Sequence, residues 1–352
     1  MWISLAKLLV VLLLFAPKLR YLIRKEKCPW DDSDLNWLQR VVFSSVRDFS
    51  RYWHGYELHG LERVKTFERT LLVGYHSRCT LDALYLIFNL QPNAIVSHLL
   101  FNLPVIKTAL PYMNLISSRA TNLDGAEARF TEALVSGKRP LMLLPGGLQE
   151  FLKPYSELGN LQWKEVPGFV KVIQQEPLLR SSVKVVPFHT KNSDCCYLNH
   201  PWWYETFGKL GERTIAMFKQ GKIWVIPVMV TILLFATGFL LLPRGVKLDV
   251  YFGEPVVLKE GESAAAFARR INEATQALID KTETMPQVRR EKRGAYSTLV
   301  GVLLGFYTFA QNTLIVGLAI GIIWFPVVVA CLSARALLYA FSAHFVRSFE
   351  PL

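Results

Sequence analysis

The chain has 352 residues, a formal net charge of +12 and 51% hydrophobic residues. This length allows one large domain or two small ones, and so high an apolar fraction is typical of a membrane-attached enzyme rather than of a freely soluble one. The basic residues flank apolar segments instead of forming a separate tail, which favours anionic lipid headgroups and anionic cofactors over nucleic acid as partners. The 5 cysteines lack zinc-ligand spacing, and we interpret them as reduced thiols of a cytosol-facing protein.

An apolar run opens the chain. Residues 2–15 are interrupted only by Lys7 and the small Ser4, and basic residues follow from Lys18 onward. The run is shorter than the ~20 residues of a bilayer span, and it lacks the clear cleavage site of a signal peptide. We therefore expect residues 1–28 to form an uncleaved membrane anchor or a hydrophobic wedge, with the basic flank in the cytosol.

The next region, residues 29–288, alternates strand and helix patterns. Short apolar runs predict strands, longer stretches predict helices, and Gly137 is a stop signal at the end of one helix. Strands are expected at residues 71–75, 94–96, 141–144, 183–188 and 248–252, and helices at 81–90, 124–135 and 263–280. This alternation predicts an α/β layered domain.

Two further apolar segments are predicted to enter the membrane. Residues 223–242 are long enough to span it. A single crossing would separate the strand at 248–252 from the strands before it, so we favour a hairpin or an interfacial insert. Residues 289–352 begin with a basic cluster and contain an apolar run, 299–332, too short for two full spans of ~20 residues. One long span or a tight hairpin remains, and basic residues on both flanks favour the hairpin.

A histidine and an aspartate stand where the first predicted strand gives way to a helix. His76 follows the strand directly, and Asp82 lies near the start of the helix, whose N-terminus stabilises a carboxylate. If Asp82 accepts a hydrogen bond from one imidazole nitrogen, the other nitrogen can remove a proton from an attacking hydroxyl, as acyl transfer without a covalent acyl-enzyme requires. The spacing alone also fits a surface histidine beside a helix-capping aspartate.

A glycine pair follows the third predicted strand. Pro145, Gly146 and Gly147 predict a tight turn whose exposed N–H groups could stabilise a developing oxyanion. The same residues also fit an ordinary strand-to-helix turn. They do not form a phosphate-binding P-loop, because no Gly-Lys-Ser/Thr follows. Glu150, just beyond the turn, fits either a helix cap or an acid behind the site.

Taken in order, these motifs resemble the lysophospholipid acyltransferase-like superfamily, in particular its diacylglycerol acyltransferase branch and the transmembrane protein 68 relatives. The resemblance rests on His-x5-Asp after an apolar strand and on the later Pro-Gly-Gly-x-x-Glu. Four further segments are similar, and the whole covers roughly residues 40–285; these segments are residues 97–104, 163–169, 185–188 and 252–255.

The resemblance implies an α/β fold with a layered mixed sheet flanked by helices, and an acyl-CoA-dependent O-acyltransferase on a cytosol-facing membrane surface. Endoplasmic reticulum is the implied location, acyl-CoA the co-substrate, a glycerolipid the acceptor and the lipid bilayer the environment, without a metal or a further cofactor. His76 would be the catalytic base and Asp82 its partner. The acyl-acceptor and oxyanion loop would comprise Pro145, Gly146, Gly147 and Glu150.

One departure from the family pattern bears on the acceptor. Members that use phosphate-bearing acceptors carry an arginine where this chain has Gln149, and arginine is well suited to binding a phosphate. We therefore expect a neutral acceptor, such as monoacylglycerol or diacylglycerol, giving triacylglycerol. Arg119 and Arg129 remain candidate phosphate contacts, or else solvated charges. A lysophospholipid or glycerol-phosphate acyltransferase and a non-catalytic membrane scaffold stay open as alternatives.

Overall fold

A computed structural model of the chain describes residues 54–65, 69–77, 80–96, 115–117, 123–196 and 246–286, with single helical residues or pairs between 43 and 51 and between 209 and 217. The expected membrane segments, at residues 1–28, 223–242 and 289–352, lie outside these ranges. Within the described ranges, no helix has both the length and the apolarity needed to cross a bilayer.

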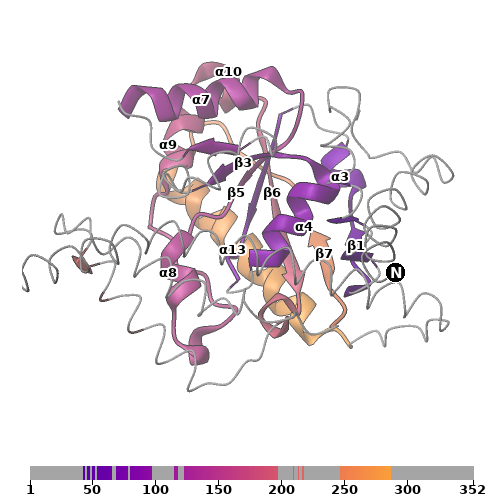
Figure 1. The fold of residues 1–352 in the computed structure, drawn as a ribbon. Helices are drawn as coiled ribbons and strands as arrows, with labels where there is room; N and C mark the ends of the chain where they lie inside the picture. The colour runs from indigo at the N-terminus through magenta and orange to yellow at the C-terminus, as the bar shows by residue number, and fades with distance from the viewer. Residues whose placement is uncertain are drawn as a thin grey trace, which may run out of the picture.

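One mixed sheet of eight strands forms the centre of the described region (Figure 1). Its order is β1-β7-β6-β2-β5-β3-β4, and β8 pairs with β6. All the pairings are parallel except those of β6 with β7 and with β8. The strands are β1 (Glu57–His59), β2 (Thr70–Gly74), β3 (Asn93–Val96), β4 (Leu115–Ser117), β5 (Leu141–Leu143), β6 (Lys184–Lys191), β7 (Asp249–Phe252) and β8 (Val256–Val257).

Helices cover both faces of the sheet. The longer ones are α4 (Thr80–Leu90), α7 (Leu123–Ser136), α9 (Gly168–Gln175) and α13 (Ala264–Thr284), and the shorter ones are α3 (Glu62–Lys65), α8 (Gly147–Leu152) and α10 (Pro177–Arg180). Because side chains alternate along a strand, Leu72 packs with α4 in one apolar cluster, while Leu71 and Val73 pack with α7, α9 and α13 in another. The fold is therefore the expected layered α/β arrangement.

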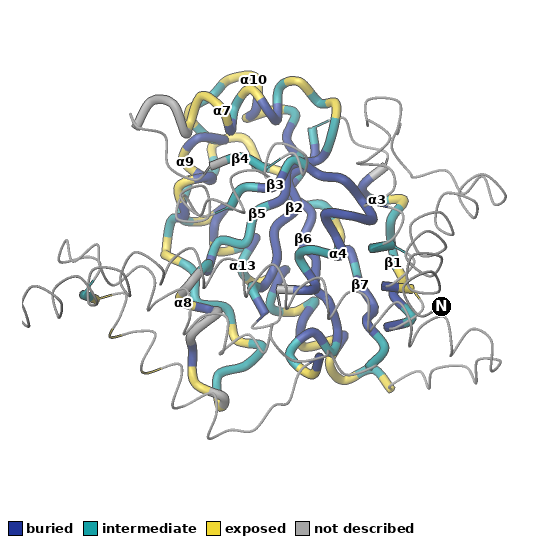
Figure 2. Tube along the Cα trace, viewed as in Figure 1, coloured by how far each residue is buried: buried dark blue, intermediate teal, exposed yellow. Residues whose placement is uncertain are grey.

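The central strands are the most buried part of the molecule. All of β2 and nearly all of β6 are buried, as the dark blue tubes in Figure 2 show. A strand buried on both faces reads as a continuous apolar run rather than an alternating one, which is why residues 71–75 and 183–188 could be assigned from the sequence. The three-residue strands β1 and β4 carry no such run and were not predicted.

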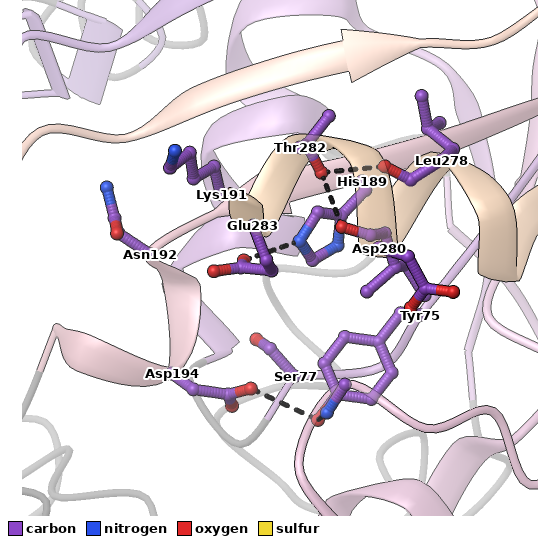
Figure 3. A network of polar contacts seen from close by, with 12 residues as sticks. Tyr75, Ser77, His189, Lys191, Asn192, Asp194, Leu278, Asp280, Thr282 and Glu283 are labelled. Carbon is purple, nitrogen blue, oxygen red and sulfur yellow. Dashed lines mark hydrogen bonds and ion pairs between the residues drawn. The ribbon is translucent and has the colours of Figure 1, made fainter. Parts of the chain in front are cut away.

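The long helix α13 is fixed at both of its ends. The Ser263 hydroxyl caps its N-terminus by accepting a hydrogen bond from the Ala266 amide over 3.2 Å. Near its C-terminus, Glu283 pairs with Nε2 of the buried His189 of β6 at 2.9 Å (Figure 3). Lys191 of the same strand donates to the Met285 carbonyl. These contacts hold α13 against β6, where its apolar face closes the second cluster.

Candidate active site

Sheet topology explains why the two sequence motifs meet. The strands that precede them, β2 and β5, are parallel neighbours, with Val73 opposite Leu143. Their carboxyl ends therefore open at the same edge of the sheet, the edge at which open α/β folds commonly bind ligands. β6 is the parallel neighbour of β2 on its other side, so the turn that follows β6 joins the same group.

His76 is held as a neutral imidazole with a defined tautomer. Its Nδ1 lies 2.9 Å from the Ser77 carbonyl oxygen. Because a carbonyl can only accept a hydrogen bond, Nδ1 must carry the proton, and the lone pair of the neutral ring is on Nε2. Burial lowers the pKa of His76 below its ordinary value, although the hydrogen bond to Ser77 acts in the opposite direction. The ring is therefore in its base form at neutral pH.

Asp82 does not contact the imidazole as the sequence analysis expected. Within the described part of the chain, its Oδ2 accepts from the Ser77 hydroxyl over 2.8 Å and its Oδ1 from the Ala83 amide over 2.6 Å. The carboxylate sits in the first turn of α4, where helix amides attract it, and Ser77 lies between it and the ring. The expected direct hydrogen bond is thus corrected to an indirect link, Asp82 to Ser77 to His76.

Asp82 is also poorly solvated. Its side chain is 6% exposed. Burial raises its pKa to about 7, against the hydrogen bonds from Ser77 and Ala83, which lower it. The carboxyl group therefore titrates close to neutral pH, beside a histidine whose pKa is shifted the other way. Opposed shifts of this kind are common at acid–base sites, although buried structural groups can also show them.

Glu150 connects the two motifs. Its side chain is 0% exposed, its Oε2 accepts from the His76 amide over 2.8 Å, and its Oε1 accepts from the Gln162 amide over 2.9 Å. Burial raises the pKa of this carboxyl, and the two amide hydrogen bonds oppose that rise. With both oxygens directed at backbone amides, Glu150 acts as an acid behind the site that positions the backbone of His76, rather than as a helix cap.

The glycine turn is built around Glu150. A Cβ atom on Gly146 would overlap the Cδ and Cγ atoms of Glu150, so a larger residue there would displace the Glu150 side chain. Gly147 has a φ of +49°, in the left-handed region that favours glycine. Its N–H donates to the Leu144 carbonyl over 3.1 Å, so the expectation that this N–H is exposed for an oxyanion is wrong. Pro145 lies within the turn and is partly exposed; its contact with substrate stays a prediction.

A cluster of three side chains beside His76 was not predicted from the sequence. The Tyr75 hydroxyl donates to Asp194, and the Lys153 ammonium lies 4.1 Å from the centre of the Tyr75 ring. Tyr75 was assigned to the strand, and the other two residues belong to no motif. Their common location follows from the order of β5, β2 and β6 in the sheet.

The two arginines predicted as phosphate contacts do not take part in the contacts described above. Arg119 is not among the described residues, and Arg129 is exposed on α7. Cys195 is exposed and Cys196 is buried; their reduced state stays a prediction.

A cluster on the edge strand β1 and its neighbour β7 brings together ligand types that suit a metal. His59 Nε2 lies 3.0 Å from Asp249 and 3.7 Å from Glu57. The sequence showed no metal-binding spacing here because β1 and β7, although neighbours in the sheet, are far apart in the chain: His59 and Asp249 are separated by 190 residues. The Lys247 ammonium already contacts both carboxylates, at 3.1 and 3.2 Å, so a cation of this chain is bound between them and we assign no metal to the cluster.

Known proteins with similar sequences are named for the synthesis of storage lipids. The chain is similar to proteins of Bos taurus and Homo sapiens, each named DGAT1/2-independent enzyme synthesizing storage lipids, with 26% identity over 242 residues. The match covers 66% of this chain, but only 62% of the bovine and 64% of the human protein. The Mus musculus protein of the same name matches equally, at 26% identity. No protein-family model matches the chain.

Among solved structures, the chain is similar to the 1-acyl-sn-glycerophosphate (LPA) acyltransferase PlsC of Thermotoga maritima. The TM-score is 0.44 and the sequence identity 13%, with 80% of this chain and 93% of that one covered.

Proposed function

We propose that the chain is an acyl-CoA-dependent O-acyltransferase that transfers a fatty acyl group to a neutral glycerolipid, with His76 as the general base. The observation that carries this proposal is the state of His76: a neutral imidazole, protonated on Nδ1 and fixed at the carboxyl edge of the sheet. The similarity to enzymes named for storage-lipid synthesis supports the same reaction class.

The proposed chemistry needs one proton carrier. Nε2 of His76 takes the proton of the acceptor hydroxyl as the oxygen attacks the thioester carbonyl of acyl-CoA. The tetrahedral intermediate collapses to an ester, and the thiolate of coenzyme A leaves and takes the proton from the imidazolium. Asp82 assists through Ser77. The carbonyl of Ser77 accepts a hydrogen bond from the Nδ1–H group of His76, and its hydroxyl donates to the Asp82 carboxylate. No acyl-enzyme forms.

The acceptor class follows from the residue beyond the glycine turn. Gln149 is exposed at that position, and an amide offers a phosphate neither a charge nor the paired donors of arginine. We therefore propose monoacylglycerol or diacylglycerol as acceptor. The proposal extends to a bilayer surface, in the endoplasmic reticulum and facing the cytosol, where both the acyl donor and a neutral lipid are accessible.

An acceptor panel tests the activity. The full-length chain, expressed and supplied with labelled oleoyl-CoA, is given diacylglycerol, monoacylglycerol or lysophosphatidic acid. Label in triacylglycerol or diacylglycerol supports the proposal. Label in phosphatidic acid alone would identify a phosphate-acceptor enzyme instead, and no transfer to any acceptor would favour the scaffold alternative. Microscopy of the same chain against an endoplasmic reticulum marker tests the location.

A pair of histidine variants tests the base. His76→Gln keeps a polar side chain of similar size but has no basic nitrogen, so transfer should fall by roughly 100-fold or more. His59→Gln, in the cluster on β1 outside the site, is the control and should retain activity. Equal activities of the two variants would remove His76 from the mechanism.

A further inference from the structure

Three segments of the chain converge on the side chain of Tyr75. The hydroxyl of this buried residue donates to Oδ2 of Asp194 over 3.1 Å, as Figure 3 shows. The hydroxyl oxygen of Tyr75 itself accepts a hydrogen bond from the Gly159 amide over 3.4 Å. Asp194 lies in the short 3₁₀ helix Ser193–Cys195 after β6, and Gly159 in the loop after α8. One phenol therefore joins the segments that follow β2, β5 and β6.

A buried ammonium lies over one face of the Tyr75 ring. Lys153 is 2% exposed, its Nζ lies 4.1 Å from the ring centre, and it donates to the Asn160 carbonyl over 2.6 Å. A cation over an aromatic face is attracted by the ring. Its charge also lies close enough to lower the pKa of Glu150, against the burial that raises it. The ring is thus held from its edge and from its face.

We propose that Asp194 is a positioning residue of the acyl-transfer site, which acts on His76 through Tyr75. This inference rests on the proposed function and adds to it a carboxylate outside both sequence motifs. Tyr75 directly precedes His76, whose own amide is held by Glu150. With the Tyr75 side chain fixed by Asp194 and the His76 amide held by Glu150, the backbone that leads into the base is restrained at two points, and small displacements of a catalytic group are costly to the rate.

Asp194 also contributes charge. Burial lowers the pKa of His76, and the negative charge of Asp194 acts in the opposite direction. An acid near the base stabilises the imidazolium that forms when the acceptor loses its proton. Among the residues that the structure describes, the ionisable groups around Tyr75 and His76 come from several elements; they are Asp82 of α4, Glu150 of α8, Lys153 after α8, Asp194 after β6, and the His189–Glu283 pair of β6 and α13.

Two nearly isosteric variants separate the geometric role from the charge. Tyr75→Phe removes the hydroxyl, keeps the ring under Lys153 and leaves the Asp194 charge in place. We expect kcat to fall by about tenfold, with KM within about twofold and the acidic limb of the pH–rate profile unmoved. Asp194→Asn keeps an oxygen that can accept from Tyr75 but removes the charge. The pKa of His76 then falls, so the acidic limb should move to lower pH.

The control removes a charge elsewhere on the same domain. Glu273→Gln lies on the exposed face of α13 and should change neither kcat nor the pH profile. Thermal unfolding of each variant shows whether it is folded. If Asp194→Asn does not fold, Tyr75→Phe decides alone, because it leaves every charged group present.

The failures of the two proposals look different. A wild-type chain without transfer in the acceptor panel overturns the proposed function itself. An active wild type with an unchanged kcat in Tyr75→Phe overturns the positioning role of Asp194. An acidic limb that stays fixed in folded Asp194→Asn does so as well, because the charge then has no access to the base.

Discussion

The amide of His76 donates a hydrogen bond to Oε2 of Glu150 over 2.8 Å, which joins the two sequence motifs through a buried carboxylate. The second oxygen of Glu150 accepts from the Gln162 amide, so the same side chain also fixes the loop beyond α8. The carboxylate is satisfied by backbone donors on both sides, and a buried carboxylate needs such donors to remain ionised. The site is thus organised around the backbone of the histidine as much as around its ring.

We expect Glu150→Gln to weaken both stability and activity. A glutamine has one acceptor oxygen, so one of the two amides would face an NH₂ group instead of an acceptor. Leaving a buried donor unsatisfied costs about 1–3 kcal/mol of unfolding free energy, and the loosened His76 should slow transfer. Denaturant unfolding and initial rates measure the two effects. Glu132→Gln, on the exposed side of α7, is the control, and equal behaviour of the two variants would contradict the role given to Glu150.

Gly146→Ala tests the space around the same carboxylate. The new methyl group would overlap Glu150, and overpacking of this kind typically costs about 1–3 kcal/mol. We expect lower thermal stability together with reduced transfer, because Glu150 must move away from the His76 amide. Gly168→Ala in the first turn of α9 is the matched control, since a Cβ atom there meets nothing within 4 Å. Comparable unfolding temperatures for the two variants would show that Glu150 can move aside without cost.

Local pattern was sufficient for most of the secondary structure but not for the contacts of the site. Apolar runs and a capping serine involve only neighbouring residues and can be recognised in the sequence. They predicted the strand at 71–75, the helix at 81–90 and the start of α13 at Ser263. The contact of Tyr75 with Asp194 spans 119 residues and depends on β6 lying beside β2. The place of Asp82 in the first turn of α4 was predicted, but its hydrogen-bond partner was misjudged. Spacing cannot show that Ser77 stands between the carboxylate and the ring.

Ser77→Ala should destabilise the protein in a pH-dependent way. The buried Ser77 hydroxyl donates to Asp82 over 2.8 Å and lowers the pKa of that carboxyl against its burial. Without the donor, the pKa of Asp82 rises further. The loss of stability should therefore be larger at pH 8, where the carboxylate is charged, and about 1.5–3 kcal/mol there. At pH 5 it should be smaller.

The control for Ser77→Ala is a serine whose hydrogen bond involves no ionisable group. Ser136 donates to the Ala133 carbonyl over 3.0 Å at the end of α7, so Ser136→Ala should cost the same at both pH values. Urea unfolding at pH 5 and pH 8 gives the comparison. A Ser77→Ala effect as independent of pH as that of Ser136→Ala would mean that the hydroxyl does not stabilise the charged form of Asp82.

Asp82→Asn should separate the effect of this carboxylate on protein stability from its contribution to acyl transfer. Burial raises its pKa from 3.8 to about 7 in the folded chain, so between these values the folded state binds a proton that the unfolded state has lost. The stability contributed by protonated Asp82 is therefore complete below about pH 4 and is lost as the pH rises to about 7. An asparagine does not titrate. The unfolding free energy of the variant, minus that of the wild type, should rise between pH 4 and pH 8, while acyl transfer falls.

Asp280→Asn, at an exposed position of α13, corrects for a general change of charge. A difference that stays level, or decreases with pH, would show that Asp82 is charged at lower pH than its burial indicates.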